Sequence, residues 1–266
     1  MMVDRREDTR VRTPLWGGSA TRTAGRSDGI QAHGTTVIFI GAPGSGKGTQ
    51  SSLLASRLGL SCISTGAMLR EEAKRDTPAG FRLRQTIANG TLVDDATVCQ
   101  IVISRLRDLR ESDSHSAPSL ILDGFPRTVN QARILDELLL GLGMPGPVVV
   151  HLDVSTDVLL RRLARRRQCE TCGAIHAVAA EQGASTENLR CQADGGVLIE
   201  RDDDNEGVIA RRLAAYTTET LPVVEYYRKR DTNQGVYRRI DGNLNPSEIA
   251  IEVRDLVLFT GAALAA

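Results

Sequence analysis

The sequence predicts an α/β fold, with a parallel sheet at its core and helices on both faces of that sheet. Short, continuous apolar runs such as TTVIFIG, SLILDG and PVVVHLDV are typical of strands buried on both faces, and GVYRRIDG is expected to form another strand. Stretches with helical spacing of leucines, including GTQSSLLASRLGL, NQARILDELLLGLG and STDVLLRRLARR, lie between these runs. Strands that alternate with helices indicate a doubly wound sheet with right-handed crossovers.

The composition is ordinary for a soluble globular protein and shows no global preference for polyanions. The 266 residues carry 33 Lys and Arg against 33 Asp and Glu, so no overall field draws the chain to nucleic acid or to an anionic membrane. No apolar run approaches the roughly 20 residues that a membrane span needs, and the first residues are charged where a signal peptide would be apolar. We therefore expect a cytoplasmic protein with neither a nucleic-acid nor a membrane partner.

Two segments interrupt the alternation of strands and helices and are predicted to be insertions. Residues 65–103 have helical patterns without a strand, and residues 166–204 are rich in Gly and Cys but poor in large apolar side chains. The second segment cannot bury a core of its own, so it needs a staple such as a metal. Residues 1–34 are expected to be a disordered extension and residues 259–266 a tail. The core is then assigned to residues 35–64, 104–165 and 205–258.

The stretch GAPGSGKGTQ directly follows the first predicted strand and opens the first predicted helix. It matches G-x-x-x-x-G-K through Gly41, Gly46 and Lys47, although Gly48 stands where Ser or Thr is usual and Thr49 comes one residue later. In such a loop the glycines let backbone N–H groups surround phosphate oxygens, and the helix N-terminus adds positive charge. The loop therefore predicts a site for nucleotide phosphates.

Five cysteines are too few for a disulfide scaffold in a chain of this length. Cys62 and Cys99 lie in the apolar stretches LSCIST and VCQIVI, where each is expected to be a small buried side chain. Both are thus assigned to the core rather than to chemistry.

The three other cysteines have the spacing of two metal-binding knuckles. Cys169 and Cys172 are followed after eighteen residues by Cys191, and Asp194 stands where a fourth cysteine would fall. Zn²⁺ accepts thiolate sulfur and carboxylate oxygen in a closed tetrahedron, which favours a structural zinc site. Asp194 is favoured as the fourth ligand because it repeats the spacing of the first knuckle, with His176 as its competitor. A redox Cys-x2-Cys pair is the remaining alternative, although such pairs normally start a helix after a strand.

Several motifs in one order make the sequence resemble a known family. GAPGSGKGTQ, ISTGAMLR, NGTLVDD and DGFPRT are followed by the Arg-flanked cysteine insertion and then by RDDDNEGVIARRL. This series is similar to the adenylate kinases with the long lid found in bacteria, from Thr35 to Leu258. Sequence motifs that occur together in this order are far more specific than any one of them.

The resemblance implies an enzyme that reversibly transfers the terminal phosphate of MgATP to AMP, giving two ADP, and that is a monomer. Residues 65–103 would be the insertion that binds the nucleoside monophosphate, and residues 166–204 would be a lid. Lids of this family carry four cysteines, or three cysteines and an aspartate, around a structural Zn²⁺. The alternatives are a GTP-dependent AMP kinase, a UMP/CMP kinase, an ATPase switch and a non-catalytic nucleotide-binding protein.

The resemblance also assigns roles to individual residues. The catalytic set is Lys47, Asp123, Arg127, Arg162, Arg201 and Arg212. The ATP-binding set is Gly44, Ser45, Gly46, Lys47, Gly48, Thr49, Arg162, Arg166 and Gly242. The AMP-binding set is Thr65, Gly66, Arg70, Leu92, Val93, Gly124, Arg127, Gln131, Arg201 and Arg212. Asp123 would hold the water shell of Mg²⁺, and the amide of Gln131 would pair with the adenine edge.

Three positions depart from the family pattern. Ala67 replaces a usual acidic residue, which is expected to weaken the placement of Mg²⁺ without abolishing activity. Asp94 stands where Pro is frequent, at the start of a turn that tolerates either residue. Arg165 replaces a common Gly at the root of the lid, where it is expected to stiffen the hinge. None of the three changes the assignment.

Overall fold

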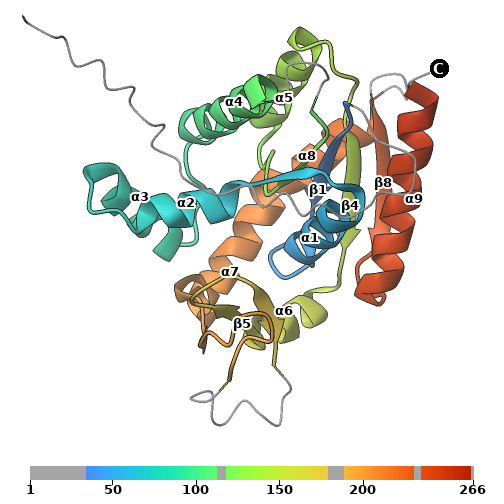
Figure 1. Cartoon of the computed structure of the whole chain (residues 1–266). Coiled ribbons are helices and arrows are strands. Elements are labelled where there is room, and N and C mark those ends of the chain that lie inside the picture. The colour runs from blue at the N-terminus through green and yellow to red at the C-terminus, as the bar shows by residue number, and fades with distance from the viewer. Residues whose placement is uncertain (1–33, 113–117, 179–188, 231–234, 265–266) are drawn as a thin grey trace, which may run out of the picture.

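The computed structural model describes residues 34–112, 118–178, 189–230 and 235–264 (Figure 1). The predicted extension therefore lies outside the described residues except for Gly34. At the centre is a parallel sheet with the strand order β2-β3-β1-β4-β8. Its strands are β1 (Thr36–Ile40), β2 (Ser61–Ser64), β3 (Leu120–Asp123), β4 (Val148–Asp153) and β8 (Val236–Asp241). The predicted α/β class with a parallel sheet is confirmed.

Helices connect and cover these strands. They are α1 (Lys47–Leu58), α2 (Thr65–Ala73), α3 (Pro78–Ala88), α4 (Asp95–Ser112), α5 (Val129–Gly141), α6 (Thr156–Ala164), α7 (Glu206–Ala215), α8 (Leu221–Arg228) and α9 (Pro246–Leu264). Polar side chains cap several of their N-termini, where backbone N–H groups have no partner within the helix. Thr77 accepts a hydrogen bond from Gly80 N, Thr128 from Gln131 N and Asn205 from Val208 N.

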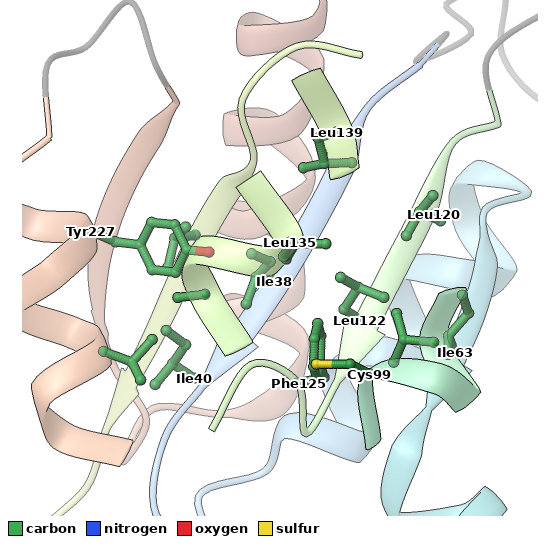
Figure 2. Packing of buried hydrophobic residues seen from close by; sticks show 14 of the residues in the cluster. Ile38, Ile40, Ile63, Cys99, Leu120, Leu122, Phe125, Leu135, Leu139 and Tyr227 are labelled. Carbon is green, nitrogen blue, oxygen red and sulfur yellow. The ribbon is translucent and has the colours of Figure 1, made fainter. Parts of the chain in front are cut away.

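The sheet is buried on both faces, as the apolar runs predict. Alternate residues of β1 point to opposite sides: Ile38 and Ile40 belong to one hydrophobic cluster, Val37 and Phe39 to the other. Helices α4, α5 and α8 cover the first face, and α1 and α9 cover the second (Figure 1). Figure 2 shows the first cluster, in which side chains from the helices meet the strands: Cys99, Leu135, Leu139 and Tyr227 against Ile38, Ile40, Leu120 and Leu122.

Strand β2 is an element that the apolar pattern did not predict. It has only four residues and pairs on one side only, with Ser61 to Ser64 in register with Leu120 to Asp123 of β3. Cys62 is exposed, so the prediction that it is buried is wrong; an edge strand has a less completely covered face. Cys99 is buried in the cluster under α4, as predicted.

The segment at residues 65–103 is helical and lies between β2 and β3 in the chain. It contains α2, α3 and the first half of α4, and α4 continues without a break to Ser112. Asp94 is the N-cap of α4: its carboxylate accepts hydrogen bonds from Thr97 N at 2.9 Å and from the Thr97 hydroxyl at 2.8 Å. These two bonds lower the pKa of Asp94 and explain physically why an aspartate serves at this position.

The cysteine-rich segment forms a small antiparallel sheet of its own, in the order β6-β5-β7. Its strands are β5 (Arg166–Cys169), β6 (Ile175–Ala177) and β7 (Leu198–Ile199). Its buried apolar cluster consists of Cys169, Cys191 and Leu198, with Ala174 and Leu189 packed against them. So small a cluster supports the inference that this segment needs a further source of order.

The chain leaves the central sheet for functional loops at one edge. Strands β1, β3 and β4 are neighbours and end at that edge. On one side of β1 lie β3 and β2, and on the other lie β4 and β8, so the strand order reverses direction at β1. Open α/β sheets bind ligands at such a point, outside the carboxyl ends of the strands. A 3₁₀ turn, η3 (Asp202–Asp204), precedes α7, and a π-helical segment, η4 (Tyr216–Thr220), joins α7 to α8. Among the described helices, none has the length and apolar character that crossing a membrane requires.

Candidate active site

A pocket opens at the carboxyl edge of the sheet, between the phosphate loop, α2, the α3–α4 connection and α7. Its lining contains these residues of the predicted sets: Lys47, Thr65, Gly66, Arg70, Leu92, Val93, Gly124, Arg127 and Arg212. The structure thus brings together residues that are more than 160 positions apart in the chain, such as Lys47 and Arg212. Apolar side chains of Leu69, Ile87 and Val98 line the same pocket and offer a surface for a flat base.

The phosphate loop has the backbone geometry that its glycines predict. Gly44 and Gly46 have φ values of 84° and 100°, in the left-handed region that other residues avoid. A Cβ atom at Gly41 would lie 2.6 Å from Ser45 Oγ and 2.7 Å from the Leu152 carbonyl, so no side chain fits there. Gly46 is also the N-cap of α1, which directs the positive end of that helix at the loop.

Lys47 is the charged centre of the loop. Its ammonium donates to the Gly41 carbonyl at 2.7 Å and to the Ala42 carbonyl at 3.0 Å. Burial lowers its pKa to about 7, with Arg127, Arg212 and Arg166 acting in the same direction and Asp123 opposing them. A buried ammonium surrounded by guanidinium groups needs negative charge, and phosphate oxygens would supply it.

Asp123 ends β3 beside the first turn of α1. The Ser64 hydroxyl donates to Asp123 Oδ2 at 3.1 Å, across the β2–β3 pair. A Cβ atom at Gly48 would lie 3.6 Å from the same oxygen, so the carboxylate lies directly over the helix N-terminus. Carboxylate and hydroxyl oxygens are ligands that suit Mg²⁺ or its water shell, so the donors present fit that ion.

Two guanidinium groups converge over Gly66, at the start of α2. A Cβ atom there would lie 3.3 Å from Arg70 Nη1 and 3.8 Å from Arg127 Nη2. Arg127 Nε donates to the Gly124 carbonyl at 2.9 Å, and Gly124 has a φ of 79° that turns the chain out of β3. Burial lowers the pKa of Arg70 to about 10 and also lowers the pKa of Arg127. This pair could hold a phosphate through planar, bidentate contacts.

Asp203 and Asp204 form ion pairs with Arg166, Arg201 and Arg212. Neither aspartate was assigned a role from the sequence. Asp203 accepts from Arg201 Nε at 2.8 Å and from Arg201 Nη2 at 2.6 Å. Asp204 forms a two-bond pair with Arg166, and Arg212 Nη1 lies 3.1 Å from Asp203 Oδ2 and 3.0 Å from Asp204 Oδ1. The run of three aspartates directly after Arg201 is the signal that could have identified them.

The two aspartates differ sharply from their exposed neighbour Asp202 because both are buried. Burial acts to raise the pKa of Asp203, but Arg212, Arg201 and Arg70 overcome that effect and hold the pKa at about 2. The carboxylate is therefore ionised at neutral pH and offsets part of the positive charge around the pocket.

Arg162 and Gly242 belong to the far side of the phosphate loop and do not line the pocket. Arg162 Nη2 donates to the Gly242 carbonyl at 2.8 Å. A Cβ atom at Gly242 would lie 3.5 Å from the Ser45 carbonyl and 2.4 Å from Val154 Cγ2, so the loop after β8 packs against the phosphate loop. The predicted ATP-binding residues thus gather around this loop, apart from Arg166, which is paired with Asp204.

Gln131 lies behind the pocket lining rather than in it. Its side chain is buried, its Oε1 accepts from Arg127 N at 2.8 Å, and its Nε2 donates to Asp95 Oδ1 at 2.7 Å. Both ends of the amide are therefore engaged within the protein. In this arrangement Gln131 supports the Arg127 backbone, and it would reach a base only after exchanging one of these bonds.

The four predicted metal ligands meet in the small sheet. The ligand atoms of Cys169, Cys172, Cys191 and Asp194 all lie within 4.8 Å of one another, and His176 is not in this group. Cys172 Sγ and Cys191 Sγ are 3.7 Å apart, and Cys169 Sγ is 3.3 Å from Asp194 Oδ1. In a tetrahedron with Zn–S bonds of about 2.3 Å, the ligand atoms are about 3.8 Å apart. The spacing and the donors therefore fit Zn²⁺.

The two knuckles have the same backbone structure. Gly173 N donates to Cys169 O at 3.0 Å and Cys169 N to Ala174 O at 2.9 Å in the first knuckle. In the second, Gly195 N donates to Cys191 O at 2.9 Å and Cys191 N to Gly196 O at 2.8 Å. The glycine after the second ligand has a φ of 74° in one and 72° in the other. Asp194 thus occupies the place that Cys172 has in the first knuckle.

Known proteins resemble the chain over most of its length. The adenylate kinase family model matches residues 39–232. The adenylate kinase of Thermodesulfovibrio yellowstonii is 38% identical over 213 residues, which cover 80% of this chain and 94% of that relative. The adenylate kinases of Syntrophotalea carbinolica and Citrifermentans bemidjiense are 40% and 41% identical over 206 residues, or 77% of this chain and 90% and 91% of those relatives.

The lowered pKa of Lys47 predicts that ligand binding takes up a proton. Phosphate groups favour the charged ammonium and raise its pKa from about 7, so above pH 7 the neutral amine must be protonated on binding. Nucleotide affinity should therefore fall as the pH rises above 7, by up to about tenfold per unit. Calorimetry at pH 8 in buffers of different ionisation enthalpy should show the uptake, and Lys47→Arg, which stays charged, should abolish it. Identical heats for the unaltered protein in all buffers would contradict this prediction.

The paired charges around Asp203 predict a specific loss of stability. Asp203→Asn removes the charge that Arg201 and Arg212 share in a buried site, and should lower the free energy of unfolding at pH 7 by about 2 kcal/mol. Denaturation in urea measures this loss. Asp202→Asn, at the exposed neighbouring position, is the matched control and should change stability little; equal effects of the two substitutions would show that the pairing contributes nothing.

Proposed function

The chain belongs to the adenylate kinase family, and from this premise we propose how its residues divide the reaction among them. The protein catalyses the reversible transfer of the terminal phosphate of MgATP to AMP, giving two ADP. Phosphoryl transfer requires positioning and charge neutralisation more than covalent participation by the protein. No general base is needed, since the phosphate of AMP is already ionised at neutral pH.

The donor phosphates bind at the phosphate loop. Gly44, Ser45, Gly46, Gly48 and Thr49 direct backbone N–H groups at the phosphate oxygens, and Lys47 exchanges its two carbonyl partners for them. Support comes from the left-handed glycines of the loop and from the lowered pKa of the Lys47 ammonium. Arg162 and Gly242, which pack together against the loop, bind the rest of ATP.

The acceptor monophosphate binds between Arg70 and Arg127. Support comes from the convergence of their guanidinium groups over Gly66 and from the burial that deprives both of water. Thr65, Leu92 and Val93, which line the same pocket, contact the ribose and the adenine. Gln131 contributes by exchanging its Asp95 contact for the adenine edge.

Arg201, Arg212 and Arg166 neutralise the charge of the phosphate in transit. All three are held by Asp203 or Asp204, which fixes their positions before substrates arrive. Donors fixed in this way need not reorganise as charge moves from one nucleotide to the other. Water must be excluded meanwhile, which is the task of the segment at residues 166–204 as a lid.

Mg²⁺ accompanies ATP in this family and, when bound, would reduce the charge of the phosphates. We assign Asp123 to its water shell, with Ser64 holding the carboxylate in place. Ala67 is exposed at the start of α2 and offers no oxygen ligand. The protein therefore relies on Asp123 and the phosphate loop for this ion.

A structural Zn²⁺ held by Cys169, Cys172, Cys191 and Asp194 orders the lid. Support comes from the clustering of the four ligand atoms and from the matching backbone hydrogen bonds of the two knuckles. The ion acts away from the chemistry: it replaces the large apolar core that this small sheet lacks. We propose a cytoplasmic monomer, the monomer being what the family resemblance implies; the balanced overall charge argues against a nucleic-acid or membrane partner.

The acceptor specificity is tested by assaying ADP-forming turnover with ATP, GTP and ITP as donors and AMP, GMP, UMP and CMP as acceptors. ATP with AMP should give the highest kcat/KM, and ATP alone should give almost no hydrolysis. Lys47→Ala should lower kcat by about 10²-fold or more while the fold is retained. A better acceptor than AMP would overturn the specificity, and full activity of Lys47→Ala would overturn the phosphate-loop assignment.

The zinc site is tested by metal analysis of the purified protein. The unaltered chain should contain one zinc per molecule, and Asp194→Ala should lower that content and the thermal stability of the lid much more than the transfer rate at low temperature. His176→Ala is the matched control and should retain zinc. Full zinc content in Asp194→Ala together with loss in His176→Ala would identify His176 as the fourth ligand.

A further inference from the structure

His151 is a buried histidine on β4 that none of the roles above uses. It lies next to Ile40 of β1, the residue that precedes the phosphate loop, and next to Arg239 of β8. Both of its ring nitrogens meet tyrosine hydroxyls: Nδ1 lies 3.0 Å from Tyr237 Oη and Nε2 lies 3.2 Å from Tyr216 Oη. The imidazole therefore joins a phenol of the neighbouring strand β8 to a phenol that directly follows α7.

The charge state of this cluster follows from its burial. Burial lowers the pKa of His151, with Arg239 and Lys47 adding to that effect and Asp153 opposing it. Burial also raises the pKa of Tyr216 to about 12 and raises that of Tyr237. A neutral imidazole has one donor and one acceptor nitrogen. It can thus donate to one hydroxyl and accept from the other, so that both contacts are satisfied together.

The two tyrosines differ in what they touch. Tyr237 lies on β8, whereas Tyr216 lines the nucleotide pocket together with Lys47 and Arg212. Tyr216 is the C-cap of α7 and the first residue of the π-helical segment η4. Its backbone N–H donates to the Arg212 carbonyl. Single π-turns within helices are rare and frequent at functional sites. Tyr216 therefore connects His151, through its hydroxyl, to the last turn of α7, which carries Arg212.

We propose that His151 is a positioning residue for phosphoryl transfer: through Nε2 it holds Tyr216, and through Tyr216 it fixes the end of α7 that presents Arg212 beside the phosphate loop. This inference rests on the proposed contact of Arg212 with the transferring phosphate. Displacement of a catalytic group by about 1 Å can cost about 10²-fold in rate. A bond that ties the end of α7 to the strand next to the loop restricts such displacement.

A purely structural role for the cluster predicts a different result. The two hydrogen bonds are alike in length and burial, so loss of either should cost similar stability and leave the rate unchanged. The positioning role predicts an asymmetry, because only the Nε2 bond leads to the pocket. Tyr216→Phe and Tyr237→Phe are therefore matched variants, each of which removes one hydroxyl from the same ring.

The experiment measures kcat, both KM values and thermal stability for these two variants. Tyr216→Phe should lower kcat by about tenfold, with each KM changed less than about twofold, whereas Tyr237→Phe should leave kcat within about twofold. Both should lower the melting temperature by similar amounts. Equal kcat in Tyr216→Phe and the unaltered protein would overturn the proposal.

Two substitutions of His151 distinguish the hydrogen bond at Nε2 from the one at Nδ1. The side-chain amide of Gln lies near the place of Nε2 and that of Asn near the place of Nδ1. His151→Gln should therefore retain most of the kcat of the unaltered protein, whereas His151→Asn should lower kcat about as much as Tyr216→Phe does. The double variant His151→Asn/Tyr216→Phe should lose no more than either single change, because both break one contact. Losses that multiply in the double variant would contradict the positioning role.

Arg212→Ala separates this inference from the function on which it rests. Loss of kcat in Arg212→Ala without loss in Tyr216→Phe overturns the positioning role alone. Full kcat in Arg212→Ala overturns the proposed contact between Arg212 and the phosphate, and the positioning role with it.

Discussion

Positive charge is concentrated and buried at the carboxyl edge of the sheet, and the surrounding elements are arranged to hold it there. Lys47, Arg70 and Arg212 are all desolvated enough for burial to lower their pKa values, to about 7 for Lys47 and about 10 for the two arginines. Asp123, Asp203 and Asp204 compensate only part of this positive charge. The pocket is therefore electrostatically incomplete without anionic ligands, and nucleotide phosphates would supply the missing charge.

That constraint explains why the arginines come from separate elements. Like charges held close together repel, so they need a rigid frame that prevents them from spreading. The parallel sheet supplies it: β1 presents the phosphate loop, β3 presents Asp123 and the turn to Arg127, and α7 presents Arg212. Both faces of the sheet are packed with apolar side chains (Figure 2), and a close-packed interior yields little to local strain.

The small sheet has the opposite physical character. Among the described residues of this segment, the buried cluster is only a few side chains. The ligand atoms of Cys169, Cys172, Cys191 and Asp194 meet at this cluster, and a metal bound by them would order the segment internally. The ion pairs of Arg166 with Asp204 and of Arg167 with Glu200 join the two ends of the segment to each other, and Asp204 also pairs with Arg212 of α7.

Sequence alone was enough to predict the parallel α/β class, the phosphate loop and the knuckle spacing, because these follow from local patterns: apolar runs, glycines and ligand intervals. It did not predict β2, which is too short to show periodicity, or the exposure of Cys62, which depends on β2 being an edge strand. The folded structure was needed to show which arginines share Asp203 and Asp204, that Gln131 is bonded to Asp95, and that His151 meets Tyr216 and Tyr237. Gln131 and His151 lie 36 or more positions from these partners, and a polar side chain carries no local mark of so distant a partner. Arg201 and Arg212 lie close in the chain to Asp203, but their spacing alone does not show that they pair with it.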